Sequence, residues 1–354
     1  MRGGKISAKN IRKKIDIQLA SVVTMIIIIS IAMSFVYDGF LSTYNIKAML
    51  MSYVPEGIIA LGLTLVIISG GIDLSVAGVM PFTAIIYCMM VKNGVNIWLG
   101  MFLVILIAAL IGATNNFLRN LLNVHPFIVT MAVQLILKGF NLVVTGSGSI
   151  SGLPEEFMRI SKIRILGIKL PLVVLIVLAV IWMIMLSKNR FFRKVYFVGG
   201  NAKAADLCGI NVNRTMYFVF IQSAILAAIA GLMAVLNFQA ANYSYGLNLD
   251  TRAITCVVVG GTSMTRGGVG SVGGTIVGVV FIALVYNAFL LSGINTYFQD
   301  VVTGVFLVGA VLLGQRVKEN KKGGFQNEKN QKSSITGDGY HYGDVTNRMW
   351  RLKE

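Results

Sequence analysis

The stretch SGGIDLS, residues 69–75, places an ionisable side chain, Asp73, inside an otherwise almost continuously apolar run. An aspartate at the centre of a membrane helix costs about 2.5–3.5 kcal/mol on insertion scales, so its presence must be required or compensated. Gly70 and Gly71 favour the end of a helix, while Asp73 and Ser75 precede the next apolar run. The pattern predicts a broken helix whose second half, beginning directly after Asp73, is capped by this carboxylate.

Two interpretations of this break remain open. Discontinuous helices with polar ends often line the substrate sites of transporters. On that interpretation Gly70, Gly71, Asp73 and Ser75 form a motif that takes part in gating. On the other, the segment is a tight capped turn near the membrane face, a structural feature that is also compatible with transport.

The rest of the chain offers few residues for catalysis or metal binding. Cys88, Cys208, Cys256 and the two histidines lie far apart and match neither a zinc site nor a disulfide framework. The apolar runs contain no nucleophile–base pair. The glycine-rich segment 257–278 lacks the GxxxxGK[ST] pattern of a phosphate loop and is interpreted as a turn between closely packed helices. We therefore expect no enzymatic activity, no metal and no cofactor bound by this chain; any ATP-Mg would be bound by another subunit.

Neutral polar side chains within the apolar runs are the next candidates. Four of them are assigned to a substrate path: Asn115, Thr130, Gln134 and Asn141. Amides and hydroxyls can hydrogen-bond a polyhydroxylated solute, but tying helices together is their commoner role. Four acidic residues lie in or near the runs: Glu56, Asp73, Asp250 and Asp300. None is paired in sequence with a histidine of the runs, so a proton relay is weakly supported. We expect a path lined by neutral polar side chains rather than by fixed charges.

The composition determines the class of protein. Hydrophobic residues make up 56% and charged residues 13% of the chain, whereas a soluble domain carries roughly 25% charged residues. Repeated apolar runs of 18 or more residues are candidates for membrane helices. The formal net charge is +17, but the basic residues lie in short loops and at the two ends, which does not favour nucleic-acid binding. The sequence predicts an all-α polytopic membrane protein.

The apolar runs predict about ten transmembrane helices. They cover residues 17–37, 45–68, 72–92, 97–118, 126–145, 168–187, 214–237, 248–264, 269–291 and 296–315. The run 248–264 is short and could be re-entrant. An even number of spans puts both termini on one side of the membrane. With both in the cytosol, 23 Lys and Arg residues face the cytosol and seven face outward, as the positive-inside rule requires.

These runs divide the chain into three parts. Residues 1–16 form a basic cytosolic N-terminus, residues 17–315 the transmembrane domain, and residues 316–354 a polar cytosolic tail with a composition typical of disorder. The cytosolic connection 188–213 contains NAKAADLCGI, in which Asn201 can cap a short helix. Such a helix suits docking to another protein, and it equally fits an ordinary amphipathic connector.

Four segments together resemble one family. They are LGLTLVIISGGIDLSVAGVM (61–80), GATNNFLRNLLNVHPFIVTMAVQLILKG (112–139), FVGGNAKAADLCGINVNR (197–214) and AITCVVVGGTSMTRGGVGSVGGTIVG (253–278). Over about residues 15–315 the chain resembles the permease subunits of bacterial binding-protein-dependent ABC importers for ribose, galactose, xylose and similar sugars. The tail after Arg316 lies outside the resemblance.

The resemblance implies a multi-pass protein of the bacterial cytoplasmic membrane that forms a homodimer or pairs with a similar permease. It also implies cytosolic ABC ATPase subunits, an extracytoplasmic sugar-binding protein and alternating access driven by the ATPase. The segment 201–210 is then the coupling helix that enters a groove of the ATPase. The residues assigned to it are Asn201, Ala202, Ala204, Ala205, Asp206 and Gly209.

The main alternative from another class is an ion-coupled secondary transporter of a small polar solute, which needs no ATPase. A membrane-embedded enzyme is a weaker alternative, because the apolar runs lack a catalytic constellation. The sequence does not identify the sugar, and nucleosides and other polyols are alternative solutes.

Overall fold

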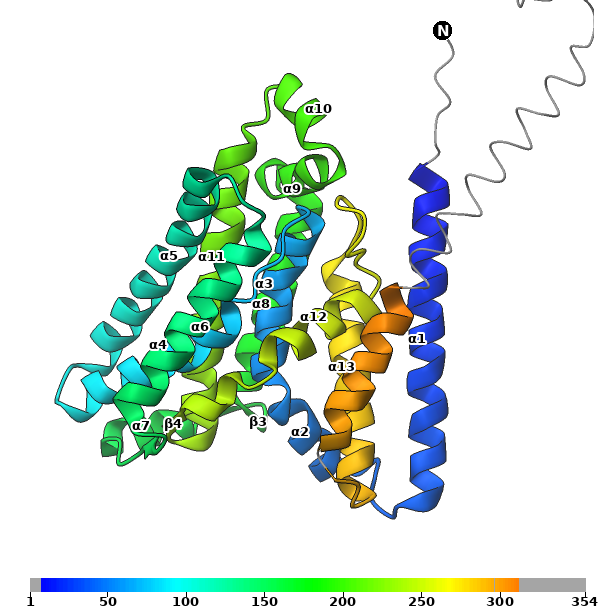
Figure 1. The fold of residues 1–354 in the computed structure, drawn as a ribbon. Helices are drawn as coiled ribbons and strands as arrows, with labels where there is room; N and C mark the ends of the chain where they lie inside the picture. Colours follow the sequence, from blue (N-terminus) through cyan, green and yellow to red (C-terminus); the bar gives the residue numbers. More distant parts are fainter. Residues whose placement is uncertain (1–7, 296, 312–354) are drawn as a thin grey trace, which may run out of the picture. The chain divides into compact units, whose positions relative to one another are not determined.

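The computed structural model describes residues 8–295 and 297–311, and these are almost entirely helical (Figure 1). The helices are α1 (Ala8–Val36), α2 (Thr43–Ser52), α3 (Val54–Ile68), α4 (Val76–Lys92), α5 (Ile97–Leu122), α6 (Pro126–Thr145), α7 (Glu155–Ser161), α8 (Leu170–Lys188), α9 (Arg190–Gly200), α10 (Ala202–Leu207), α11 (Val212–Phe238), the 3-10 helix η1 (Tyr243–Gly246), α12 (Leu249–Val259), α13 (Val272–Leu291) and an unlabelled helix, Tyr297–Val311. The strands are β1 (Ser149–Ile150), β2 (Arg164–Ile165), β3 (Ile168–Lys169) and β4 (Ala241–Asn242). They form two antiparallel pairs, β1 with β4 and β2 with β3.

Six of the described helices are long and apolar enough to cross a membrane: α1, α5, α6, α8, α11 and α13. The pair α2 and α3 makes a seventh candidate that bends by 51° between the two helices. The helices α4 and Tyr297–Val311 are apolar but shorter. The prediction of an all-α polytopic membrane protein is thus confirmed. Length and composition account for six or seven of the ten predicted spans.

Most predicted boundaries lie within a few residues of the helix ends, and two differences are larger. The prediction 126–145 coincides with α6, and the prediction 214–237 lies within α11. The run 45–68 is divided into α2 and α3 because Pro55, which lacks an N–H, occupies the first turn of a new helix. The helix α1 already begins at Ala8, inside the predicted N-terminal segment 1–16. The predicted tail 316–354 lies outside the described residues.

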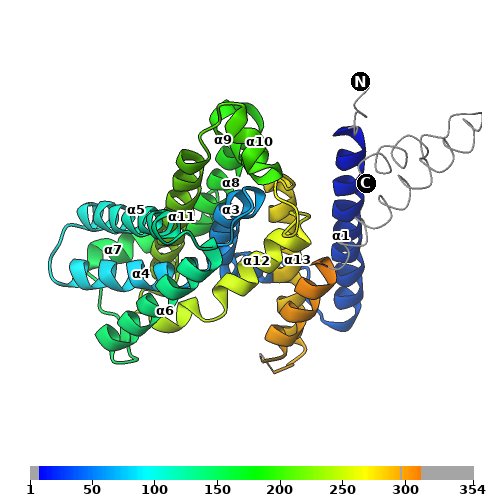
Figure 2. The same cartoon turned by 45° about the horizontal axis from the view of Figure 1, so that its top comes forward.

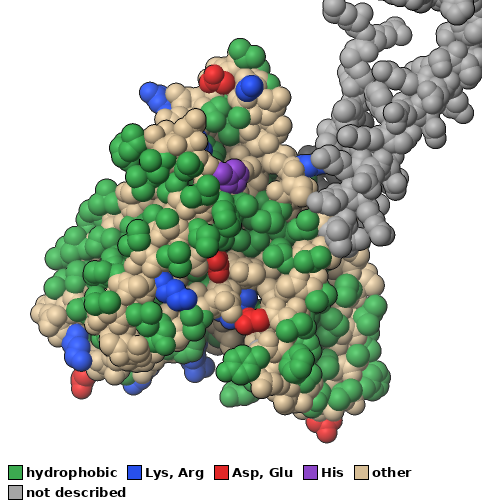
Figure 3. Space-filling view, viewed as in Figure 1, with side chains coloured by type: hydrophobic (Ala, Val, Ile, Leu, Met, Phe, Trp, Pro, Cys, Tyr) green, Lys and Arg blue, Asp and Glu red, His purple; other side chains and the backbone are tan. Residues whose placement is uncertain are grey.

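The helix α11 forms the centre of the packing and contacts α3, α4 and α5. Its close contact with α5 depends on Gly112, where a Cβ would lie 2.8 Å from the Cα of Ile221. Other helices expose large apolar side chains, as Phe102 of α5 and Ile136 of α6 do, and hydrophobic side chains cover much of the face in Figure 3. Because lipid is as apolar as these side chains, this surface fits a protein surrounded by a bilayer.

The polar connections gather at two ends of the helices. The helices α9 and α10 and the loop 260–271 lie at one end, and α7 lies with the short strands at the other (Figure 1). The helix α1 stands at one edge, beside α13, in both views (Figure 1 and Figure 2). Gln18 of α1 also donates a hydrogen bond to the carbonyl oxygen of Val258 at 3.3 Å. The predicted connection 188–213 therefore contains two helices and lies opposite the connection between α6 and α8.

Candidate functional site

The predicted helix break at residues 69–75 is present, and glycine ends its first half. Gly70 has φ +83°, a conformation that side chains disfavour. The N–H of Gly70 donates to the carbonyl oxygen of Ile67 at 3.0 Å, and the N–H of Gly71 donates to the carbonyl oxygen of Val66 at 2.9 Å. This pair of bonds is a Schellman motif, which satisfies carbonyl groups that the end of α3 would otherwise leave free.

Asp73 holds the start of the second half through Ser75. One carboxylate oxygen of Asp73 accepts from the Ser75 N–H at 3.0 Å and from the Ser75 hydroxyl at 2.6 Å. Asn115 of α5 donates to the same hydroxyl oxygen at 2.8 Å. The carboxylate thus binds the N–H of Ser75, the residue that precedes α4. The helix begins at Val76 rather than directly after Asp73, and the side chain of its N-cap residue, Ser75, makes no capping bond, so the predicted cap by Asp73 is wrong in its details. All three side chains are buried, so the break is tied into the core.

The short helix α10 forms at the predicted place. The side chain of Asn201 accepts from the N–H of Ala204 at 3.0 Å, which is the predicted N-terminal cap. Gly209, with φ +79°, ends the helix through a second Schellman motif. Ala205 alone is buried among residues 201–209, whereas Leu207 is 90% exposed. A six-residue helix with one buried residue offers nearly its whole surface to a partner.

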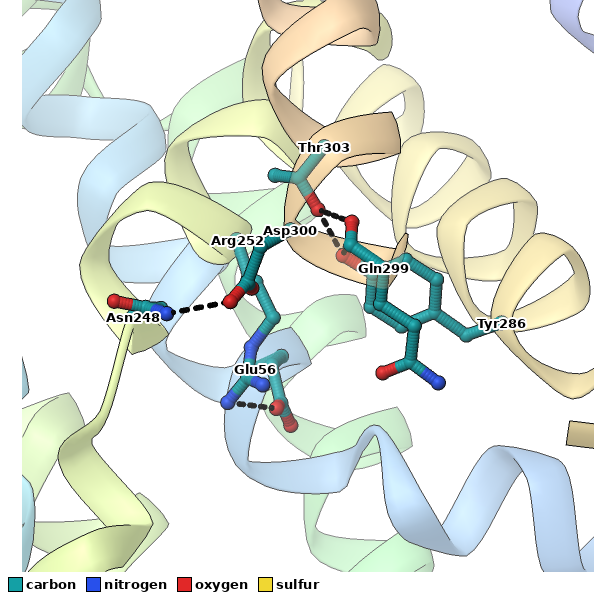
Figure 4. Close-up of polar contacts among 7 residues, drawn as sticks. All are labelled: Glu56, Asn248, Arg252, Tyr286, Gln299, Asp300 and Thr303. Carbon is teal, nitrogen blue, oxygen red and sulfur yellow. Dashed lines mark hydrogen bonds and ion pairs between the residues drawn. The ribbon is translucent and has the colours of Figure 1, made fainter. Parts of the chain in front are cut away.

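Charged and amide side chains converge at the beginning of α12 (Figure 4). Arg252 forms an ion pair with Glu56 of α3 at 3.2 Å, and Asn248 donates to Asp300 of the helix Tyr297–Val311 at 2.9 Å. Asp250 accepts from Gln134 of α6 at 3.2 Å. The hydroxyl of Tyr286 in α13 donates to the carbonyl oxygen of Gln299 and is hydrogen-bonded to the hydroxyl of Thr303, and both bonds hold the helix that carries Asp300 (Figure 4). We call Gln134, Asn248, Asp250, Arg252 and Asp300 the α12 polar cluster.

The α12 polar cluster lies at the depth of apolar helices. Gln134 is eight residues into α6, so the Asp250 carboxylate is held about 12 Å from the start of that helix and about 16 Å from its end. Asn248 and Asp300 are exposed, and Asp250 and Arg252 are partly so. Figure 3 shows acidic and basic side chains beside a hollow in a largely hydrophobic face. Charges at such depth face a water-filled space or a partner rather than lipid.

Comparison of the sequence with known proteins shows the family to which the chain belongs. The family model described as branched-chain amino acid transport system / permease component matches residues 45–311. The ribose import permease protein RbsC of Haemophilus influenzae is 36% identical over 84% of this chain and 92% of its own. The chain belongs to this permease family. RbsC of Bacillus subtilis is 34% identical over 82% of this chain and 90% of its own, and the D-allose transport system permease protein AlsC of Escherichia coli is 29% identical over 83% and 90%. No solved structure matches.

Membership confirms the resemblance and several of its implications. The permease is a transport component rather than an enzyme, and a multi-pass protein of the bacterial cytoplasmic membrane. Permeases of ABC importers work with ATPase subunits and a solute-binding protein, so the family implies both kinds of partner in general.

The four residues that the sequence assigned to a substrate path occupy different environments in the permease. Asn115, Thr130 and Asn141 are each 1% exposed. Asn115 bonds Ser75, Thr130 donates to the carbonyl oxygen of Ile72 at 3.4 Å, and Asn141 donates to that of Gly78 at 3.3 Å. These bonds tie α5 and α6 to the broken helix. Gln134 alone belongs to the α12 polar cluster.

The sequence analysis did not assign Glu56, Asp250, Arg252 and Asp300 to a site. It found three of these as isolated acidic residues and counted Arg252 among the outward-facing cations. A signal was present in DTR, residues 250–252, where two opposite charges directly precede an apolar run. The contacts of Arg252 with Glu56, of Asp250 with Gln134 and of Asn248 with Asp300 depend on the packing of separate helices and leave no local pattern in the sequence.

Proposed function

We propose that this permease is the membrane-spanning subunit of an ABC importer that moves a sugar of the ribose class into the cell by alternating access. Separate cytosolic ATPase subunits drive the change. Binding of ATP shifts the permease between its two conformations only if the nucleotide-bound ATPase interacts more strongly with one conformation than with the other. Two permease chains, identical or similar, enclose the path, and an extracytoplasmic binding protein delivers the sugar. The names of the relatives, for ribose and D-allose, support a sugar over the amino acids of the family description.

The α12 polar cluster is the observation that carries the choice of substrate. Its carboxylates and amides accept hydrogen bonds from hydroxyl groups, and its amides and Arg252 donate them, so it matches a neutral polyol. A branched-chain amino acid could also pair its ammonium and carboxylate groups with these charges, but it would need an apolar pocket for its side chain as well. We propose that the solute passes the cluster, and that Asn115, Thr130 and Asn141 border the path through the broken helix. This proposal replaces the expected uncharged path with one that contains fixed charges of both signs.

The proposed topology has ten spans and both termini in the cytosol. The chain reverses direction between successive proposed spans in Figure 1, with α12 rising between α11 and α13. An 11-residue α12 is about 16 Å long and covers only part of a hydrocarbon core of about 30 Å. The non-helical segment that precedes it is admissible at membrane depth where it lines a water-filled path. The short α12 thus fits a span that begins inside the path.

In this proposal α10 docks to the ATPase through its exposed residues. Ala202, Ala204 and Asp206 are exposed and available for contact. Ala205 faces the permease and positions the helix, so an arginine at residue 205 would disturb folding as well as docking. Asn201 and Gly209 set the two ends of the helix. Asp206→Arg is the sharper variant, because only the exposed surface changes.

Reconstitution tests the proposal. Proteoliposomes are prepared with the permease alone, with its ATPase, and with ATPase and binding protein, and uptake of radiolabelled ribose is measured with and without ATP. We expect uptake only in the complete system with ATP, and we expect Asp206→Arg to abolish co-purification of the ATPase. Uptake by the permease alone under an ion gradient would show a secondary transporter instead.

The substrate path is tested in the same vesicles by Asp250→Asn. We expect uptake per ATPase complex to fall at least about tenfold, since a hydrogen bond to a charged group contributes about 1.5–3 kcal/mol and each 1.4 kcal/mol is about tenfold. Asp38→Asn is the matched control, because Asp38 is exposed between α1 and α2, away from the cluster. Equal uptake by the two variants would remove Asp250 from the path while leaving the importer assignment intact.

A further inference from the structure

Three segments far apart in the sequence meet through their backbones next to α10. The carbonyl oxygen of Ile68, at the end of α3, accepts a hydrogen bond from the N–H of Gly268 at 2.6 Å. Gly199, in the last turn of α9, lies against both residues. The contact therefore joins the broken helix 69–75, the loop 260–271 and the helix that leads into α10. We call Ile68, Gly199 and Gly268 the backbone junction.

Only glycine fits at residue 199. A Cβ there would overlap the carbonyl oxygen of Ile68 and would lie 2.7 Å from the backbone nitrogen of Gly268. Both neighbours are backbone atoms, so no side-chain rotation can relieve the overlap. Gly200, the next residue of the same helix, has nothing within 4 Å of its own Cβ position. The two adjacent glycines therefore differ in the direction of their Cβ positions: that of Gly199 points at the other two segments, and that of Gly200 points into open space.

A side chain strengthens the same connection. Tyr196 lies three residues before Gly199, on the same face of α9. Its hydroxyl donates to the carbonyl oxygen of Gly270 at 2.9 Å, and its partial burial raises the pKa of the phenol. The loop 260–271 is thus held to α9 at two points, one by backbone contact and one by the tyrosine.

The link from the backbone junction to α10 is short. The helix α9 ends at Gly200 and α10 begins at Ala202, so Asn201 alone separates them. Because Asn201 also caps α10, the connection is ordered by a hydrogen bond. A displacement of α10 therefore acts directly on α9, and α9 cannot move at Gly199 toward Ile68 or Gly268 without displacing them.

Two of the three segments at the backbone junction connect it to the proposed substrate path. Ile68 ends the helix half that precedes Asp73 and Ser75, and the loop that contains Gly268 joins α12 to α13. The other end of α12 carries the α12 polar cluster. We propose that the backbone junction, centred on Gly199, transmits the ATP-driven displacement of α10 to the broken helix and to α12 together. This inference rests on the proposed function, and it makes Gly199 a positioning residue for transport.

The test compares Gly199→Ala with Gly200→Ala in the complete importer in proteoliposomes. Ribose uptake and ATP hydrolysis are measured in the same sample, and their ratio is the readout. We expect Gly199→Ala to bind the ATPase and hydrolyse ATP while its uptake per ATP falls about tenfold, within the usual range of coupling between sites. We expect Gly200→Ala to keep the wild-type ratio. An assembled Gly199→Ala importer with the wild-type ratio would overturn the inference.

A second variant covers the case in which Gly199→Ala does not assemble. Tyr196→Phe removes one hydroxyl and keeps the ring, so its folding should be unaffected, and we expect a several-fold lower uptake per ATP. A wild-type ratio in Tyr196→Phe, with no assembled Gly199→Ala, would also overturn the inference. The wild-type importer separates failure of the proposed function from failure of this inference. If the wild type shows no ATP-dependent ribose uptake, the proposed function is wrong, whereas a wild-type ratio in the variants contradicts only the role of the backbone junction.

Discussion

At the scale of single residues, local hydrogen bonds compensate only part of the cost of burying Asp73, because its Oδ2 atom is buried without a partner among the described residues. One carboxylate oxygen accepts from both donors of Ser75, and Ser75 in turn accepts from Asn115. A buried donor without an acceptor costs about 1–3 kcal/mol, so the three side chains support one another. The aspartate that the sequence made conspicuous is thus a component of the helix break whatever its part in gating.

This arrangement predicts different effects for two substitutions of Asp73. Asp73→Ala removes the acceptor and leaves both donors of Ser75 buried, so we expect a loss of stability of about 1–2 kcal/mol. Asp73→Asn keeps an acceptor oxygen for Ser75 and should be closer to wild type. Thermal unfolding of the detergent-purified permease measures the difference. Equal loss in both variants would show that the negative charge, rather than the acceptor, is what the site requires.

At the scale of helices, glycine brings α12 and α13 into contact. A Cβ at Gly278 would overlap the carbonyl oxygen of Cys256 and lie 3.0 Å from the backbone nitrogen of Gly260. Gly274 has an equally close contact with the carbonyl of Gly260. The sequence analysis interpreted the segment 257–278 as a turn between closely packed helices, and the contacts of Gly274 and Gly278 show this close packing, which we call the glycine seam. Gly270 precedes α13 and belongs to the loop instead.

We expect Gly278→Ala to lower the free energy of unfolding of the permease by about 1–3 kcal/mol, because the two helices must separate to admit the methyl group. Gly139→Ala is the matched control: Gly139 also lies within a helix, but nothing approaches its Cβ position within 4 Å. There alanine should be neutral or stabilising by up to about 1 kcal/mol, owing to its better helix propensity. Unfolding midpoints of the two variants in detergent decide the matter; a Gly278→Ala midpoint equal to that of Gly139→Ala would contradict the glycine seam.

The elements also show which features a sequence can reveal. The helix α6 and the cap at Asn201 were predicted correctly because hydrophobic runs and capping residues act over a few neighbouring positions. The break at Gly70 was recognised for the same reason. The ion pair between Glu56 and Arg252, and the backbone junction at Gly199, bring together residues from separate helices. Their partners are set by tertiary packing, so residue type alone indicated neither the charged cluster nor the need for glycine.

At the scale of the whole molecule, the proposed topology fixes the side on which each polar end lies. In that topology the helix α10 and the loop 260–271 lie at the cytosolic end, on the side to which the positive-inside rule assigns the excess of basic residues. The helix α7 and the short strands then face outward, toward the binding protein. A native cysteine makes the end that carries α10 accessible to a chemical label. Cys208 is exposed directly after α10, whereas Cys88 and Cys256 are buried and should not react.

Labelling of Cys208 with a membrane-impermeant maleimide therefore tests the sidedness. We expect no labelling in intact cells and strong labelling in inverted vesicles. In a Cys208→Ser background, Glu156→Cys on the exposed surface of α7 should show the opposite pattern. Co-expression of the ATPase should protect Cys208 in inverted vesicles, because the cysteine directly follows the proposed docking helix, and should leave residue 156 unaffected. Labelling of Cys208 in intact cells would place α10 outside and make docking of a cytosolic ATPase there impossible.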